Sequence, residues 1–218
     1  DGSVNSLQSA MATLKATPDC LAVVGTAGNA LAGQMASWMA RETPDLAHVA
    51  PWLHNTPPES QGNTFGVFAT RREQITHAIT ALSIMGVSEL GVAYVSTDEQ
   101  ARNHTDMEQT AAKLKLRLRS YVATQGLAAL AASLRADTPR ILIFLGGTPE
   151  LAQFAQAIEK QAVQRYIVAM SDVNLQALQQ LGVSRYTPVI ATQAVPLINS
   201  NLPVVRSFRD TLGRLYDE

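Results

Sequence analysis

The chain has 218 residues, of which 46% are hydrophobic and 16% charged, and its formal net charge is -1. A chain of this length forms one or two domains, which bury enough apolar surface to need no disulfide or metal ion for stability. The 17 basic and 18 acidic side chains form no cluster of five like charges, which argues against a nucleic-acid partner. No apolar stretch reaches the roughly 18 residues that span a bilayer, and the single cysteine, Cys20, allows no internal disulfide.

Short aliphatic runs alternate with amphipathic helix patterns along the chain, which predicts an α/β fold. Apolar residues at helical spacing predict a first helix that begins at Val4. The run Cys20–Gly25 predicts a strand buried on both faces, and a helix that ends near Glu42 follows it. The other elements predicted in this half are strands over 46–50 and 63–69 and a helix from 75 to 86.

The second half repeats the same strand and helix unit. Strands are predicted over 90–96, 116–123, 140–147 and 166–171, with a helix after each of the first three. A last strand-like run over 187–196 precedes an amphipathic helix over 202–216. The pattern predicts two Rossmann-like lobes with mostly parallel sheets, joined by hinge strands. Because strands joined by helices run parallel, ligand sites are expected at their carboxyl ends.

The loop after the first predicted strand contains Gly25, Gly28 and Gly33. Glycines in this place favour a turn in which backbone N–H groups and Asn29 meet a small carboxylate or carbonyl group. The spacing does not match the G-x-G-x-x-G pattern of dinucleotide sites, so no nucleotide cofactor is predicted. An ordinary strand-to-helix turn is the alternative interpretation.

Trp52 and His54 lie in the loop after the second predicted strand. An aromatic ring at a strand end packs well against the apolar part of a ligand. The alternative is that Trp52 covers the hydrophobic top of its own lobe. The four histidines lie in separate predicted elements, so no metal site is predicted.

Two adjacent arginines, Arg71 and Arg72, follow the third predicted strand. They would either neutralise an acidic ligand or remain solvated at the start of a helix. Asp98 and Glu99 also open a helix, and we interpret them as groups that stabilise its amino end. No serine lies in a G-x-S-x-G turn and no nucleophile is paired with a base, so the chain is not predicted to be an enzyme.

Four stretches share a pattern with one known family. They are LAVVGTAGN followed by a helix and APW, NTFGVFATRRE, RILIFLGGTPELAQFAQAI and TPVIATQAVPLINSNLPVVRSFRD. Their order resembles the type 1 periplasmic binding proteins of the Leu/Ile/Val-binding family, the receptors of branched-chain amino acid ABC importers. The resemblance covers essentially the whole chain and maps it to the middle of a family member. Further α/β units are therefore expected before Asp1 and after Glu218.

The resemblance implies a first lobe over 1–86, a second lobe over 87–190, and a return segment with a helix to the first lobe over 191–218. A small ligand would lie between the lobes. The contacts carried over by position are Asn29, Ala30, Leu53, His54 and Thr70 from the first lobe, and Tyr94, Gly147, Thr148, Ser171 and Asp172 from the second. Trp52 is added as an aromatic ring at a strand end, and Arg71 as a positive charge that could neutralise an acidic ligand.

The resemblance implies a periplasmic solute-binding protein that captures an amino acid, a small organic acid or an amide and delivers it to an ABC transporter permease. Lobe closure would perform this function without a cofactor or a metal ion. Phe68 stands where an arginine is common in the family, and Thr148 where an aromatic residue is common, which argues against an ordinary branched-chain amino acid. Two alternatives stay open: a ligand-sensing domain of a signalling receptor or regulator, and an enzyme on a doubly wound α/β fold.

Overall fold

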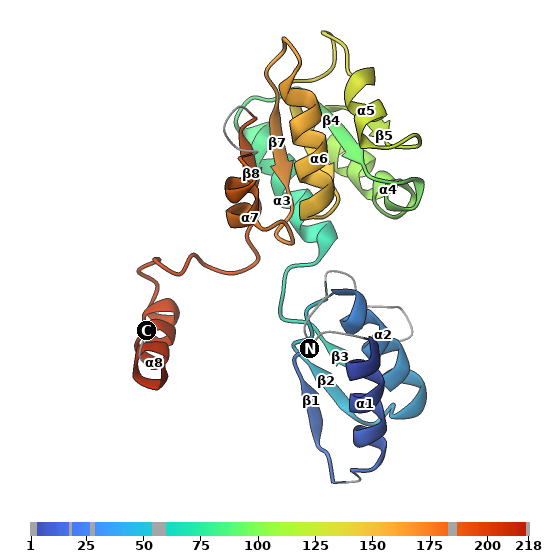
Figure 1. The fold of residues 1–218 in the computed structure, drawn as a ribbon, viewed down its shortest axis with the longest axis vertical. Helices are drawn as coiled ribbons and strands as arrows, with labels where there is room; N and C mark the ends of the chain where they lie inside the picture. Colours follow the sequence, from blue (N-terminus) through green and yellow to red (C-terminus); the bar gives the residue numbers. More distant parts are fainter. Residues whose placement is uncertain (1–3, 18, 27–28, 54–59, 183–186, 217–218) are drawn as a thin grey trace. The chain divides into compact units, whose positions relative to one another are not determined.

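The computed structural model describes residues 4–17, 19–26, 29–53, 60–182 and 187–216. The chain consists of two compact units, Asp1–Glu73 and Gln74–Glu218 (Figure 1). Each unit contains its own parallel sheet. The predicted α/β fold with two parallel sheets is confirmed.

The first unit is a three-stranded sheet in the order β1-β2-β3 with two helices. Its elements are α1 (Val4–Lys15), β1 (Ala22–Val24), α2 (Asn29–Glu42), β2 (Ala47–Val49) and β3 (Thr64–Phe65). Both helices lie on the same side of the strands (Figure 1). Leu7 of α1 and Met35 and Met39 of α2 form the core of this unit, and Val23 of β1 packs against it.

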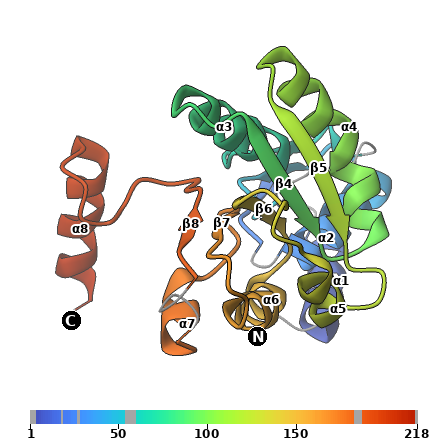
Figure 2. The same ribbon diagram turned by 90° about the horizontal axis from the view of Figure 1, so that it is seen from above.

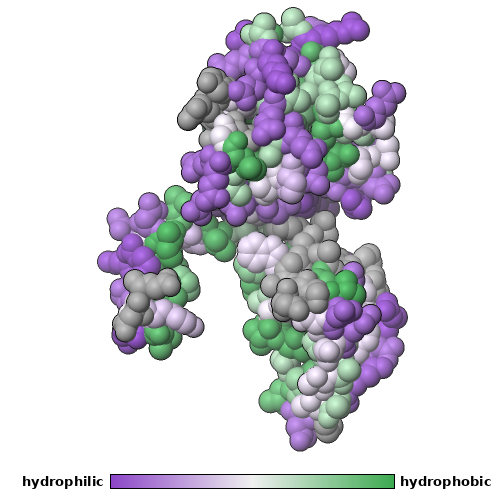
Figure 3. Space-filling view, in the orientation of Figure 1, coloured by the Kyte–Doolittle hydropathy of each residue, from purple (hydrophilic) through white to green (hydrophobic). Residues whose placement is uncertain are grey.

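The other face of this sheet is apolar and exposed. Val24 is 77% exposed and Phe65 55%, and Figure 3 shows apolar side chains over the β1 side of the unit. The prediction that Cys20–Gly25 forms a strand buried on both faces is therefore wrong for this structure. The reason is that the helices of the first unit cover one face only, whereas parallel sheets usually have both faces covered.

The second unit is a five-stranded parallel sheet in the order β5-β4-β6-β7-β8. Its elements are α3 (Arg71–Ile84), β4 (Glu89–Tyr94), α4 (Thr97–Lys113), β5 (Arg117–Val122), α5 (Leu127–Ser133), β6 (Ile141–Leu145), α6 (Thr148–Glu159), β7 (Tyr166–Ala169), α7 (Leu175–Gln180), β8 (Val189–Ala191) and α8 (Pro203–Leu215). The first residues of α3 precede the boundary between the units. Every strand and helix that the sequence predicts by its hydrophobic pattern is present.

Helices cover both faces of the second sheet, and Figure 2 shows α3 and α4 on one side and α5, α6 and α7 on the other. Alternate residues of each central strand enter the two cores. On β4, Val92 packs with α3 and α4, whereas Ala93 packs with α5 and α6. Helix α3 packs in this unit through Ile75 and Ile79, although the boundary predicted at residue 86 assigns it to the first lobe.

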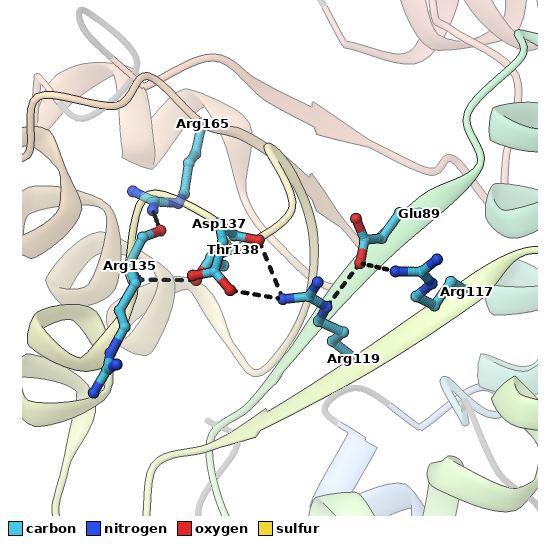
Figure 4. Close-up of polar contacts among 7 residues, drawn as sticks. All are labelled: Glu89, Arg117, Arg119, Arg135, Asp137, Thr138 and Arg165. Atoms are coloured by element: carbon cyan, nitrogen blue, oxygen red, sulfur yellow. Dashed lines mark hydrogen bonds and ion pairs between the residues drawn. The ribbon is translucent and has the colours of Figure 1, made fainter.

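The amino ends of β4 and β5 carry a network of charged groups (Figure 4). Glu89 Oε1 lies 2.7 Å from Arg119 Nε, and Arg119 Nη1 donates to the backbone oxygen of Asp137 at 3.1 Å. Arg165 is 2% exposed, and its Nη2 donates to the backbone oxygen of Arg135 at 2.8 Å. The charged groups of this edge therefore bind to one another and to the backbone. The carboxyl edge of the same sheet carries the candidate ligand residues.

Helix α8 has one apolar face that the described part of the second unit leaves largely uncovered. Val204 is 68% exposed, Phe208 55%, Leu212 43% and Leu215 70%. These residues recur at intervals of three or four, so they lie on one side of the helix. Only Val205 of α8 is buried.

Candidate functional site

The strand order of the second sheet reverses between β4 and β6. The chain passes from β4 to β5 on one side and then returns beyond β4 to β6 on the other. In open parallel sheets, ligands bind outside the carboxyl ends of the strands at such a point. Tyr94, Gly147 and Thr148 lie at these two strand ends, and Ser171 and Asp172 follow β7, the next strand. The structure therefore brings the five residues predicted for the second lobe to one edge.

The turn after β6 is closely surrounded by the side chains of Val95 and Phe144. A Cβ at Gly146 would lie 2.3 Å from Val95 Cγ1, so only glycine fits between the ends of β4 and β6. Gly147 then caps α6 without a side-chain hydrogen bond. A Cβ at Gly147 would lie 2.9 Å from Glu150 Oε2, so this carboxylate sits beside the turn. A ligand amino or amide group is electrostatically better suited to this position than an anion.

Ser171 and Thr148 supply hydroxyl groups at the same edge. The Ser171 N–H donates to Gln74 Oε1 at 2.9 Å, and Thr148 Oγ1 accepts from the Asn174 N–H at 2.9 Å. The Ser171 hydroxyl oxygen is buried and has no hydrogen-bond partner among the described residues. Buried polar groups are normally paired. A ligand atom or a water molecule at this point would complete the hydrogen bonding of Ser171.

Tyr94 lies at the right strand end, but its side chain is in the core. It is 0% exposed, and its hydroxyl lies 3.5 Å from both His104 Nδ1 and Met107 Sδ of α4. Burial raises the pKa of Tyr94 to about 12. Its backbone oxygen accepts from the Ala123 N–H at 2.9 Å. Tyr94 therefore contributes packing beneath the edge rather than an open polar group.

The carboxyl edge of the first sheet holds the other predicted residues. Asn29 and Ala30 begin α2, and the Leu53 side chain, 6% exposed, packs against Ala32 and Ala36 of that helix. Trp52 is 42% exposed, and its ring centroid lies 4.9 Å from that of Phe68 at an interplanar angle of 46°. His54 lies outside the described residues.

Thr70 and Glu73 form a reciprocal cap at the amino end of α3. Glu73 Oε2 accepts from the Thr70 N–H and the Thr70 hydroxyl, both at 2.8 Å, and Thr70 Oγ1 accepts from the Glu73 N–H at 3.2 Å. The Thr70 backbone and hydroxyl hydrogen bonds lower the pKa of Glu73. Arg71, the next residue, is only 8% exposed. The polar groups of Thr70 are therefore already used within the helix cap.

His48 of β2 lies beside the turn that the glycines predict, and the sequence did not single it out. It is fully buried, and its Nε2 lies 2.9 Å from Thr26 Oγ1 and 3.0 Å from the Gly25 backbone oxygen. Thr26 has a φ of 147° and Gly25 a φ of 78°, and positive φ at a β-branched residue is strained. His48 thus supports the turn that leads to Asn29. Alternation in β2 alone could have indicated that its side chain points inward.

Ser120, His104 and Glu108 lie in contact on β5 and α4, which bears on the enzyme alternative. Ser120 Oγ is 3.3 Å from His104 Nδ1, and His104 Nε2 is 3.1 Å from Glu108 Oε1. Tyr94 shares the same Nδ1, and Ser120 lies on the edge strand β5, opposite Val92 of β4. In the described ranges, no three His, Cys, Asp or Glu side chains are grouped to hold a metal ion.

Comparison with known proteins finds similarity in structure only. No family model matches the sequence, and no curated protein matches it. An extracellular ligand-binding receptor from Verminephrobacter eiseniae has a TM-score of 0.76 and 19% identity, over 95% of this chain and 62% of that chain. A leucine-binding protein from Thermotoga maritima has a TM-score of 0.76 and 16% identity, over 100% of this chain and 63% of that chain.

An ABC transporter substrate-binding protein from Desulfitobacterium hafniense in complex with Leu has a TM-score of 0.73 and 13% identity, over 97% and 63% of the two chains. The present chain thus spans less than two thirds of the length of these solved structures. It has the fold of the type 1 periplasmic binding proteins, as the sequence resemblance implies. In the part of the chain that the structure describes, no helix is both long and apolar enough to cross a membrane.

Proposed function

We propose that the chain is part of a periplasmic solute-binding protein that captures a small polar metabolite between its two lobes and delivers it to the permease of an ABC importer. The observation that carries the proposal is the buried Ser171 hydroxyl, which has no partner among the described residues and follows β7, the strand next to the strand-order reversal between β4 and β6. That arrangement is a binding edge without a nucleophile and base. The structural neighbours include a leucine-binding protein and a substrate-binding protein in complex with Leu.

The acidic residues at the carboxyl edge of the second sheet favour one class of ligand. The strand-end loops and first helical turns at the second edge contain Asp98, Glu150 and Asp172 and no lysine or arginine, whereas Glu99 is paired with Arg102 of α4 at 2.7 Å. Opposite charges attract most strongly where solvent is excluded. An amino acid or an amide, which presents N–H donors to these groups, is therefore favoured over a plain organic acid. Arg71 and the turn that follows β1 would receive the ligand carboxylate from the first lobe.

The proposal includes the return of residues 191–218 to the first lobe. Two observations support it: the exposed apolar face of the first sheet, represented by Val24 and Phe65, and the exposed apolar face of α8, represented by Phe208 and Leu212. A return segment of this kind would give the two lobes a second connection about which to hinge.

A thermal-shift screen of the chain against L-leucine, L-glutamine, short carboxylates, amides and nucleotides tests the proposal. A ligand at 100 times its dissociation constant adds ~2.7 kcal/mol to the free energy of unfolding, which is roughly a 5 to 10 °C rise in Tm at this size. We expect such a rise with an amino acid or an amide. A rise with nucleotides alone, or with none of the compounds, contradicts the proposal.

A pair of variants links the shift to the candidate site. Ser171→Ala removes the unpaired hydroxyl and is expected to reduce the ligand-dependent rise in Tm. Ser133→Ala is the matched control, because the Ser133 hydroxyl binds only the Leu130 carbonyl oxygen of its own helix. An equal reduction in both variants would show that the ligand binds elsewhere. Fractionation of the cells that make the protein, probed with an antibody to the chain, tests the periplasmic location.

A further inference from the structure

The carboxamide of Gln74 joins three segments at the edge that carries the candidate ligand residues. Gln74 lies in the first turn of α3 and is 3% exposed. Its Oε1 accepts from the Ser171 N–H at 2.9 Å and from the Thr192 hydroxyl at 2.8 Å. Ser171 follows β7 and Thr192 follows β8, which is its neighbour in the sheet. One side chain therefore anchors two adjacent strand ends to α3.

The positions of these residues in the chain make the link unusual. Gln74 is the first residue of the second unit, and Thr192 is the residue at which the chain leaves the last strand of its sheet. They are 118 residues apart, and Gln74 and Ser171 are 97 apart. The two lone pairs of a carboxamide oxygen suffice for both donors. Removal of this oxygen would leave a partly buried N–H and a partly buried hydroxyl without their acceptor.

We propose that Gln74 is a positioning residue for ligand binding, which holds Ser171 and Asp172 in the geometry that receives the ligand. The inference rests on the proposed function. Affinity depends on groups that are held in place before the ligand arrives, because ordering them during binding costs free energy. Without the Gln74 acceptor, the strand ends after β7 and β8 lose their common anchor while the sheet hydrogen bonds remain.

Two substitutions separate the acceptor from the volume of the side chain. Gln74→Met keeps the length of the side chain and removes the acceptor, whereas Gln74→Glu keeps acceptor oxygens in place. Amide hydrogen exchange measured by NMR is expected to rise about tenfold at Ser171 in Gln74→Met, with the rates in β4 and β6 unchanged. Calorimetric titration with L-leucine, L-glutamine and succinate is expected to give about tenfold weaker binding for Gln74→Met, with affinity retained by Gln74→Glu.

Unchanged amide exchange at Ser171 in Gln74→Met would overturn the inference, because the hydrogen bond would then not hold this strand end. An equal rise in exchange throughout β4 and β6 would also overturn it, because the substitution would then lower the stability of the whole unit. Thr192→Val removes one of the two donors to Gln74, so in the Gln74→Met background it is expected to change ligand affinity little. If the effects of the two substitutions on affinity add fully, the inference is also contradicted. If the unmodified chain binds none of the three compounds, the proposed function loses its support. Exchange at Ser171 then still decides whether Gln74 holds this strand end.

Discussion

The His48 ring supports the turn after β1 through its Nε2 hydrogen bond. The Gly25 carbonyl oxygen can only accept, so Nε2 carries the hydrogen, and Nδ1 is buried without a partner among the described residues. Burial lowers the pKa of His48, an effect that the hydrogen bond to Gly25 partly opposes. In the unfolded chain the pKa is about 6.5. As the pH falls below that value, the unfolded state takes up a proton that the folded state resists, so stability is lost.

We expect His48→Gln to reduce the fall in Tm between pH 7 and pH 5. The substitution removes the imidazole whose pKa burial lowers in the folded state. Differential scanning calorimetry at several pH values measures the effect. His77→Gln is the control, because His77 is exposed on α3 and its replacement should leave the pH dependence of the unmodified chain. Parallel loss of stability in His48→Gln and the unmodified chain would contradict this role.

Trp52 tests the two interpretations of the loop after β2. At 42% exposure and with its ring against that of Phe68, it is not a typical core aromatic. We expect Trp52→Ala to weaken ligand binding and to cost less than the ~3 to 5 kcal/mol of a buried Trp→Ala change. Titration calorimetry and chemical unfolding measure the two effects. Unchanged affinity with a loss of ~3 kcal/mol or more would make Trp52 a structural residue of its own lobe.

The reciprocal cap makes the amino end of α3 depend on one hydroxyl. Thr70→Ala removes the oxygen that accepts from the Glu73 N–H, and we expect it to cost about 1 kcal/mol. Urea unfolding measures this change. Thr76→Ala, at an exposed position of the same helix, is the control and should be neutral or slightly stabilising, since alanine favours helix. Equal effects of the two substitutions would exclude a capping role for Thr70.

Hydrophobic pattern predicted the helices and strands well because each element must bury one or two faces. β6 is such a case: its continuous aliphatic run lies between helices on both sides. The same pattern was misleading for β1, since a continuous run does not reveal whether the second face has a covering layer. The position of Tyr94 in the sequence correctly predicts that it lies at a strand end, but its side chain is buried in the core. The contacts of Gln74 span 97 and 118 residues and leave no local signal.

Two compact units with separate cores are expected to unfold in separable transitions. Met39 is 0% exposed in the first core and Leu142 is 0% exposed in the second. Replacement of either residue by alanine should cost ~2 to 5 kcal/mol in its own unit. Differential scanning calorimetry should therefore show Met39→Ala and Leu142→Ala each lowering a different transition. A single transition that both substitutions lower equally would mean that the units unfold as one.

The long chain separation between Gln74 and its two partners has a kinetic consequence. Contacts that close long loops carry a large entropic cost and tend to form after the local structure is complete. The Gln74 hydrogen bonds should therefore be absent from the transition state for folding of the second unit. In stopped-flow experiments, Gln74→Met should unfold faster than the unmodified chain and refold at nearly the same rate. The Gln74 carboxamide would then slow the unfolding of this sheet edge without speeding its folding.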